Sequence, residues 1–451
     1  MTTGEFRPIA RHAATVLTGQ LAVMAFGVTD TLVAGRQSPE ALATLSVGSA
    51  VYVSVFVALM GVLQALLPIW AEIQGAGHPQ RLGRSVRQSL YLSGLAGLLG
   101  MAALLLPGLA LEWTQVPEAL QPAVREYLAV LALALPASLL FRQYSTLNQA
   151  LHRPKLVTWL QLAGLVLKVP LSMALAWGGP GWPALGATGC ALATLLVNYV
   201  MLGLAVWMLR SQALYAPYRL WQALERPDVR QLGTFLRLGI PAGLSILVEV
   251  TSFTLMALFI ARLGTTAAAS HQIASNLAAV LYMMPLSIAI ATSARTSYWL
   301  GAERPDLAAH AARTGLLMAF TLSVVFSSLL LATHRQLPWL YTHEAEVAGR
   351  AAALLFWVAL YHLSDGLQTV CAFVLRCYRI TLAPLLVYST LLWGAGLAGG
   401  YVLAYRGLAG RAAWQTADAF WASSAAALAA VALIFMPILW RAMRRRQQPG
   451  R

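Results

Sequence analysis

Residues 242–261 read AGLSILVEVTSFTLMALFIA, twenty residues of which only Glu249 carries a charge. At about 1.5 Å of rise per residue, a helix of this length crosses the roughly 30 Å of hydrocarbon in a bilayer. A strand of a membrane barrel would instead alternate apolar and polar residues over about ten positions. The stretch therefore predicts a membrane-spanning helix with a carboxylate in its interior.

Similar runs recur along the whole chain. The 451 residues are 59% hydrophobic and 10% charged, whereas soluble domains average about 25% charged residues. The first run is too long for a signal-peptide core and lacks a small-x-small cleavage site, so we expect it to be retained as a helix. Hydropathy predicts an all-α membrane protein with twelve spans, at about 12–34, 44–69, 88–111, 124–142, 156–178, 186–209, 236–260, 271–294, 311–333, 349–370, 381–403 and 420–442.

The net charge of +15 has a topological explanation. If the termini and every second loop share one side of the membrane, that side holds 23 of the 31 Lys and Arg residues. The other side holds seven, and Lys168 lies within a predicted helix. The positive-inside rule then predicts that both termini are cytoplasmic, in a bacterial inner membrane, with anionic lipid headgroups as partners and no nucleic acid.

The chain also repeats itself with a constant shift of 226 residues. Many of the identities fall in loops, where shared Leu and Ala content cannot explain them. The matched positions include Arg36 with Arg262, Ala41 with Ala267, Ser49 with Ser275, Gly75-Ala76 with Gly301-Ala302, Pro79 with Pro305, Arg87 with Arg313, Trp113 with Trp339, Glu118 with Glu344 and Arg153 with Arg379.

The repeat predicts two lobes of six helices each. We expect an amino-terminal lobe at 1–209, a cytoplasmic linker at 210–236 and a carboxy-terminal lobe at 237–451. Six is an even number, so both lobes enter the membrane in the same direction, related by a pseudo-two-fold axis along the membrane normal. Such lobes enclose a central cavity that rocking would expose alternately to each side. This architecture predicts a transporter that works as a monomer and is not an enzyme.

Three carboxylates lie inside predicted spans. Besides Glu249 they are Asp30, in LAVMAFGVTDTLVAG, and Asp365, in LLFWVALYHLSDGLQTVCAFVL. A charge at mid-bilayer costs about 2.5–3.5 kcal/mol on insertion scales and usually faces a polar cavity or an ion path. Helical spacing places Asp365 with Tyr361, His362, Gln368 and Thr369, and Glu249 with Ser245, Ser252 and Phe253. The shift of 226 duplicates none of the three acids. A site for a coupling ion and a structural hydrogen-bonded pair are both compatible with this pattern.

Three segments resemble the multidrug and toxic compound extrusion (MATE) family, in its NorM-type branch. They are VTDTLVAGRQSPEALATLSVG at 28–48, ARLGTTAAASHQIASNLAAVLYMMPLSIAIATSARTSYWLG at 261–301 and YHLSDGLQTVCAFVLRCYRITLAPLL at 361–386. The resemblance implies a cation-coupled exporter with two six-helix lobes. It implies that Glu249 and Asp365 couple transport to Na+ or H+ in the carboxy-terminal lobe, with Tyr361 beside them. It also implies that Asp30 is the acid of the amino-terminal lobe.

The fifth helix departs from the family pattern. Where NorM-type members read Asn-x-Pro-x-Asn, this chain reads Lys168-Val169-Pro170-Leu171-Ser172. An ammonium deep in a helix needs a partner, and the family geometry makes Asp30 the nearest candidate. We expect a Lys168–Asp30 ion pair that closes the amino-terminal lobe to free cations. The alternative is that Lys168 extends to the membrane interface.

Other residues are weaker candidates. Aromatic and thioether side chains suit flat apolar cations, and Gln272 is a candidate for lining the cavity. His362 is a candidate titratable group. Plain packing is the alternative for each. These candidates for the cavity and the substrate are Gln272, Phe253, Met256, Tyr282, Met283 and His362.

Missing motifs narrow the energy source. The sequence has no GxxxxGK[ST], HExxH or GxSxG motif, and its three cysteines lack metal-ligand spacing. We therefore expect no cofactor and no metal beyond Na+ at Glu249 and Asp365. The leading hypothesis is efflux of cationic, amphipathic drugs by antiport with Na+ or H+. A flippase for a lipid-linked precursor, an exporter of another metabolite, and a channel or scaffold are the alternatives.

Overall fold

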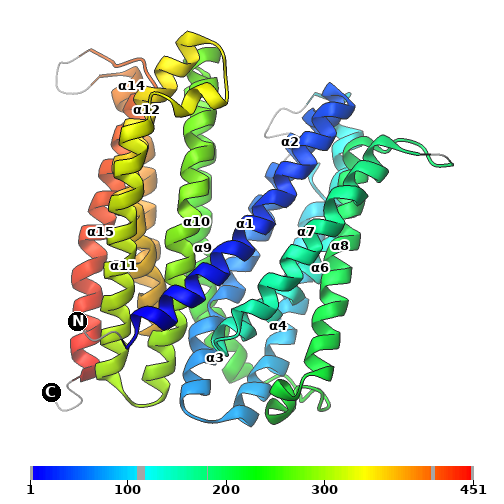
Figure 1. Ribbon diagram of the computed structural model, residues 1–451, viewed down its shortest axis with the longest axis vertical. Coiled ribbons are helices and arrows are strands. Elements are labelled where there is room, and N and C mark those ends of the chain that lie inside the picture. The colour runs from blue at the N-terminus through cyan, green and yellow to red at the C-terminus, as the bar shows by residue number, and fades with distance from the viewer. Residues whose placement is uncertain (1–3, 109–116, 180, 408–411, 448–451) are drawn as a thin grey trace. The chain divides into compact units, whose positions relative to one another are not determined.

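The computed structural model describes residues 4–108, 117–179, 181–407 and 412–447 (Figure 1). Within these ranges the chain is helical, with a single isolated bridge between Gly179 and Trp182 and no strand. Trp113, one of the repeat positions, lies outside the described residues. The α-helices are α1 (Phe6–Gln37), α2 (Pro39–Gln64), α3 (Leu66–Gly75), α4 (Pro79–Leu105), α6 (Gln121–Ala150), α7 (Pro154–Trp177), α8 (Gly186–Ser211), α9 (Val229–Ala261), α10 (Thr265–Gly301), α11 (Pro305–Thr333), α12 (Ala345–Cys377), α13 (Leu382–Tyr388), α14 (Gly399–Tyr405) and α15 (Asp418–Gln447). Shorter turns of helix are η1 (Ala213–Tyr218), η2 (Leu337–Leu340) and the π-helix η3 (Ser389–Ala398).

Twelve helical spans among the described residues are long and apolar enough to cross a membrane, which confirms the predicted number. The helices are longer than the apolar runs. The run predicted at 271–294, for example, belongs to α10, which extends from Thr265 to Gly301. Helical hydrogen bonding continues past the edge of the hydrocarbon, whereas hydropathy detects only the apolar part. The protein is an integral membrane protein.

The repeat is visible in the helix boundaries. A shift of 226 residues carries the span Pro39–Gly75 onto Thr265–Gly301, and it carries the start of α4 at Pro79 onto the start of α11 at Pro305. The loop before each of these prolines turns through a residue with positive φ, Gly77 at 71° and its counterpart Glu303 at 57°. The duplication therefore extends to the conformation of a turn.

Contacts divide the chain into two compact units, which are described separately below. The amino-terminal unit comprises Thr18–Gly243, and the carboxy-terminal unit comprises Leu244 onward together with the residues before Thr18. Both boundaries fall inside helices, α1 and α9, whereas the sequence suggested a division at the polar stretch 210–236. That stretch belongs to the amino-terminal unit.

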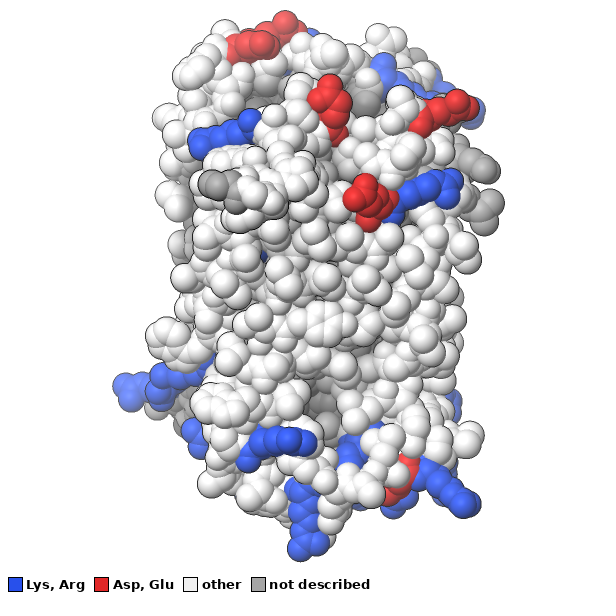
Figure 2. Space-filling model, turned by 90° about the vertical axis from the view of Figure 1, so that its right-hand side faces the viewer, with Lys and Arg blue, Asp and Glu red and all other residues white. Residues whose placement is uncertain are grey.

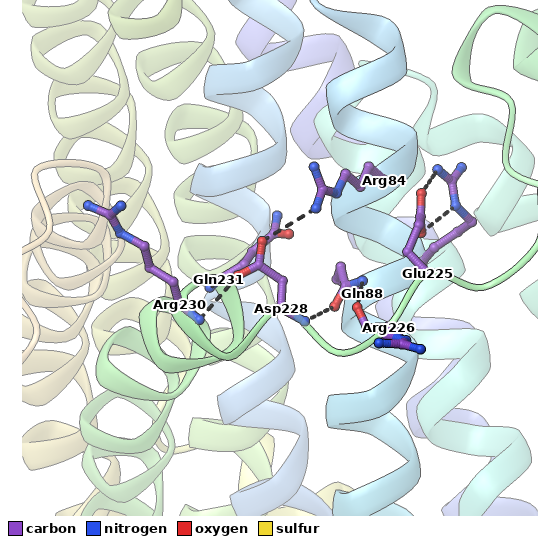
Figure 3. A network of polar contacts seen from close by, with 8 residues as sticks. Arg84, Gln88, Glu225, Arg226, Asp228, Arg230 and Gln231 are labelled. Atoms are coloured by element: carbon purple, nitrogen blue, oxygen red, sulfur yellow. Dashed lines mark hydrogen bonds and ion pairs between the residues drawn. The ribbon is translucent and has the colours of Figure 1, made fainter.

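The polar stretch is held against α4. Arg87 forms an ion pair with Glu225, and its Nη1 donates to the carbonyl of Arg219 at 2.6 Å. Figure 3 shows the neighbouring contacts, in which Gln88 accepts from the backbone N–H of Asp228 at 2.8 Å. The Asp228 carboxylate accepts in turn from the backbone N–H groups of Arg230 and Gln231, capping the start of α9. The segment is thus an ordered connection with its own hydrogen bonds.

Charged side chains are segregated on the surface. The face drawn in Figure 2 has a band nearly free of charge between two charged ends, and one end is dominated by Lys and Arg. Some of the basic residues that we assigned to loops are instead buried in helices. Arg87 and Arg376 are 4% and 6% exposed, so they make specific contacts and do not face lipid headgroups.

Candidate functional site

Glu249 of α9 lines a small cavity within the carboxy-terminal unit. The cavity measures about 20 Å³, which is room for one water-sized particle. From α9 it is lined by Glu249, Ser252, Phe253 and Met256, which follow the expected helical spacing. The remaining lining residues are Tyr361, Leu392, Leu397 and Ser424. Two of these, Leu392 and Leu397, come from the π-helix η3, a helix type that recurs at functional sites.

Asp365 lies deeper and is held by its own helix, α12. It is 3% exposed, and its Oδ1 accepts a hydrogen bond from Gln368 Nε2 at 3.0 Å and one from Thr369 Oγ1 at 3.5 Å. Gln368 in turn accepts a short hydrogen bond from the hydroxyl of Tyr388. The predicted polar face of α12 is therefore present, and α13 adds a tyrosine to it.

The two acids are neighbours without being directly bonded. Their charges lie within electrostatic range of one another. Among the described residues, however, no hydrogen bond joins them, and none is made by the Glu249 carboxylate. A structural hydrogen-bonded pair is thus absent from the described part of the chain, which leaves Glu249 free to bind an occupant of the cavity.

Aromatic rings form one wall beside Glu249. Phe253, Tyr361 and Trp421 pack edge to face, with ring centroids 5.8–6.1 Å apart. Trp421 Nε1 donates to Nδ1 of His271 at 3.2 Å, which fixes the indole against α10. The ring of Tyr361 is thereby positioned with its neighbours, one helical turn before Asp365.

The donor set fits a small monovalent ion. Carboxylate, hydroxyl and carbonyl oxygens are ligands for hard cations. The described residues contain no group of three or more His, Cys, Asp and Glu that could hold a metal ion, so the charge needed for a multivalent metal is missing from them. Two carboxylates with nearby hydroxyls suit Na+ or a proton.

In the amino-terminal unit the expected ion pair is present. Lys168 of α7 lies 2.7 Å from Asp30 Oδ1 of α1, and the lysine side chain is fully buried. Its Nζ also donates to the carbonyl of Cys190 at 2.9 Å and to Thr194 Oγ1 at 2.7 Å, both on α8. Ser172 donates to Asp30 Oδ1 at 3.0 Å. The alternative, in which Lys168 extends to the membrane interface, is wrong.

The other sequence candidates lie in different settings. Gln272 is exposed on α10 and its amide donates to Asn276 at 3.5 Å. His362 is 2% exposed, and its Nε2 has no hydrogen-bond partner among the described residues. Tyr282 lies within electrostatic range of both Glu249 and Asp365. Met283 is partly buried on α10 and, unlike Met256, does not line the Glu249 cavity.

Sequence reasoning missed several contributors. Tyr388 reaches Gln368 from a different helix, Thr194 reaches Lys168, and Trp421 supports Tyr361. Each lies on an apolar helix and is separated by 20 or more residues from its partner. No local spacing marks such residues, because only the packing of helices brings them to the site.

Comparisons with known proteins agree with this arrangement. A sequence model described as MatE matches residues 16–174 and 241–402. The chain is 38% identical over 436 residues to the probable multidrug resistance protein NorM of Aromatoleum aromaticum, covering 97% of this chain and 94% of that protein. It is 34% identical over 403 residues to multidrug resistance protein PmpM of Pseudomonas aeruginosa, covering 88% of this chain and 84% of that protein.

Solved structures show the same fold. The Vibrio cholerae MATE transporter VcmN in its bent form has a TM-score of 0.86 at 17% identity, covering 100% of this chain and 99% of that one. The eukaryotic MATE transporter AtDTX14 has a TM-score of 0.85 at 18% identity, covering 99% and 98%. The matched sequence model spans most of the chain, and the relatives above 30% identity span nearly all of it. The chain therefore belongs to the MATE family, among its NorM-type members.

Proposed function

We propose that the protein exports amphipathic organic cations from the cytoplasm by antiport with Na+ or H+. It would lie in the bacterial inner membrane with both termini in the cytoplasm. The relatives' names, multidrug resistance protein NorM and PmpM, support drug efflux. The small-molecule substrate and the coupling ion are its functional partners, and no cofactor is required.

The observation that carries the proposal is the setting of Glu249. Its carboxylate lines a cavity inside a membrane helix bundle and has no hydrogen-bond partner among the described residues. An ionised carboxylate in such a place is costly unless a cation or proton neutralises it. An inorganic cation, a proton or the charged group of an amphipathic substrate would each satisfy the same need.

Competition for this carboxylate gives a mechanism of exchange. A small ion fits the cavity of about 20 Å³, whereas a larger organic cation requires the surrounding helices to move apart. The two occupants therefore favour different conformations, and each shifts the population toward its own. If those conformations open to opposite sides of the membrane, an inward ion gradient drives the substrate outward. Phe253 and Tyr361 supply aromatic surface for a flat cation.

A flippase for a lipid-linked precursor needs free basic groups for an anionic headgroup. Three of the basic residues buried in helices are already paired with carboxylates: Lys168 with Asp30, Arg87 with Glu225, and Arg295 with Glu5. These pairs favour a cationic substrate over an anionic one. Export of a cationic metabolite other than a drug would use the same site.

Transport by purified protein in liposomes tests the proposal. We expect efflux of a fluorescent organic cation when a Na+ gradient or a proton gradient, imposed separately, runs opposite to the substrate. Glu249→Gln should reduce gradient-driven transport at least tenfold, because a neutral amide cannot exchange one cation for another. The matched control is Glu346→Gln, which removes an acid from an exposed surface pair with Arg350 and should leave transport unchanged.

Other outcomes would redirect the proposal. Transport of the organic cation that ignores both gradients would exclude antiport with these ions. Movement of a lipid-linked anion with no movement of organic cations would favour the flippase. Equal transport by Glu249→Gln and wild type would remove Glu249 from the coupling step.

A further inference from the structure

The ammonium group of Lys168 is bound as completely as a ligand in a dedicated site. An ammonium has three hydrogens to donate, and Lys168 Nζ has three oxygen acceptors within 2.9 Å. They are Asp30 Oδ1, Thr194 Oγ1 and the carbonyl of Cys190. No hydrogen of this fully buried group is left without an acceptor.

The hydroxyl groups around the ammonium are oriented as for a cation. Thr194 Oγ1 donates its hydrogen to the Cys190 carbonyl at 3.0 Å, so its lone pairs are available to Lys168. Ser172 spends its hydrogen on Asp30 at 3.0 Å. One carboxylate, one carbonyl and one hydroxyl thus present oxygen lone pairs to a single point. Hard oxygens in this combination suit any small monovalent cation.

Close packing of α7 and α8 builds this arrangement. A Cβ at Gly189 would lie 2.5 Å from the backbone carbon and oxygen of Leu175. The glycine therefore permits the approach that brings Cys190 and Thr194 of α8 to a lysine on α7. The oxygens come from α1 and α8, while the cation is supplied by α7.

We propose that this is a monovalent-cation site whose occupant is the Lys168 side chain, a tethered cation in place of an exchangeable one. A free ammonium, methylammonium or alkali cation takes the position once the lysine is shortened. In wild type the site stays filled through the transport cycle. That last consequence rests on the proposed function, since it confines ion exchange to the carboxy-terminal unit.

The binding test does not depend on transport. Lys168→Ala leaves a cavity the size of the lost butylammonium chain, facing the uncompensated Asp30 carboxylate. Purified Lys168→Ala protein should melt at a lower temperature than wild type. Methylammonium or ammonium should raise its melting temperature saturably, by about 3 °C or more when the salt is well above its dissociation constant. Tetramethylammonium, which cannot donate a hydrogen bond, should not.

Two controls isolate the site. Lys155 is the only other lysine of the chain and is exposed, so Lys155→Ala should neither lose stability nor respond to ammonium salts. The double variant Asp30→Asn/Lys168→Met removes both charges together. It should recover stability and lose the cation response, because removal of a whole buried pair is far cheaper than removal of one partner.

The outcomes are distinct. A Lys168→Ala protein that no small cation stabilises beyond its effect on wild type overturns the proposal. If Lys168→Ala folds only when methylammonium is present, the proposal is supported. If it folds under no salt while the double variant folds, the site does not accept a free cation and the proposal is wrong. Failure of drug transport by wild type would overturn the proposed function while leaving this melting result intact.

Discussion

At the scale of single residues, Gln368 connects the carboxy-terminal site. Its amide donates to Asp365 and Thr369 at 3.0 Å each, and its carbonyl accepts from Tyr388. Gln368→Met conserves volume but leaves the buried acid and the tyrosine hydroxyl without this partner. We expect a loss of about 1–3 kcal/mol in the free energy of unfolding, measured by denaturant unfolding in detergent. Ion-driven transport should fall as well, because Asp365 loses its orientation.

The same substitution elsewhere provides the comparison. Gln272 is exposed on α10, and its single bond to Asn276 is long, at 3.5 Å. Gln272→Met should change stability by no more than about 0.5 kcal/mol. Equal effects of the two substitutions would show that the Gln368 hydrogen bonds contribute nothing.

The sequence reached only half of this residue network. Gln368 and Thr369 were predictable because helical spacing places them beside Asp365 on one face. Tyr388 was not, because it lies on α13 and contacts Gln368 only after two helices pack. Lys168 was predictable as a partner of Asp30, since a buried ammonium requires a counter-charge. Thr194 and the Cys190 carbonyl were not, because apolar helices contain many hydroxyls and carbonyls and nothing marks these two.

At the scale of elements, one glycine controls the contact between α7 and α8. The space beside Gly189 is filled by the backbone of Leu175 and Ala176, which cannot move aside as a flexible side chain can. Gly189→Ala should therefore force the helices apart and cost about 1–3 kcal/mol. It should also weaken the hydrogen bonds from Lys168 to α8, seen as faster amide hydrogen exchange in both helices.

A second glycine of α8 is the matched control. A Cβ at Gly203 would meet no atom within 4 Å. Gly203→Ala should be neutral or stabilise by about 0.5–1 kcal/mol, because alanine is the better helix former. If both variants lost the same stability, helix propensity and not close packing would explain the effect.

The connection between the repeats carries a pH-dependent contact. Hydrogen bonding from the Arg87 guanidinium, together with the charges of Arg87 and Arg84, holds the pKa of Glu225 below its usual value near 4.5. A lowered pKa means that the ion pair stabilises the docked segment fully above that usual value. This stabilisation is lost as the pH falls through the lower pKa of the folded state.

Limited proteolysis of residues 219–228 measures this contact. Between neutral pH and pH values below 4.5, cleavage of wild type by an acid-tolerant protease should accelerate up to about fivefold relative to Glu225→Gln. Glu225→Gln should show only the pH response of the protease. Parallel pH profiles for the two proteins would mean that the Arg87–Glu225 pair does not hold the segment.

Elements were predictable in number but less so in extent. Apolar runs located all twelve spans, because hydrophobic length is a strong signal in membrane proteins. Their ends were missed by several residues, since α9 and α10 continue through polar sequence outside the runs. The π-helix of η3 had no sequence signal, because Ser389–Ala398 is as apolar as an ordinary span.

At the scale of the whole molecule, the repeat makes a prediction about topology. Six spans in each half put repeat-related loops on the same side of the membrane, whereas an odd number would put them on opposite sides. Two pairs of exposed positions separated by 226 residues test this: Gln80 with Asp306, and Glu118 with Glu344. The excess of Lys and Arg places the first pair in the cytoplasm and the second outside.

Single cysteines at these four positions can be distinguished by a membrane-impermeant maleimide. The native Cys190, Cys371 and Cys377 are buried, so background labelling should be low in the unmodified protein. We expect Glu118→Cys and Glu344→Cys to react in intact cells. Gln80→Cys and Asp306→Cys should react only after permeabilisation. Labelling of both pairs with the sides exchanged would reverse the orientation and place the termini outside. A split within either pair would contradict a parallel repeat, and two lobes entering the membrane in the same direction would then be untenable.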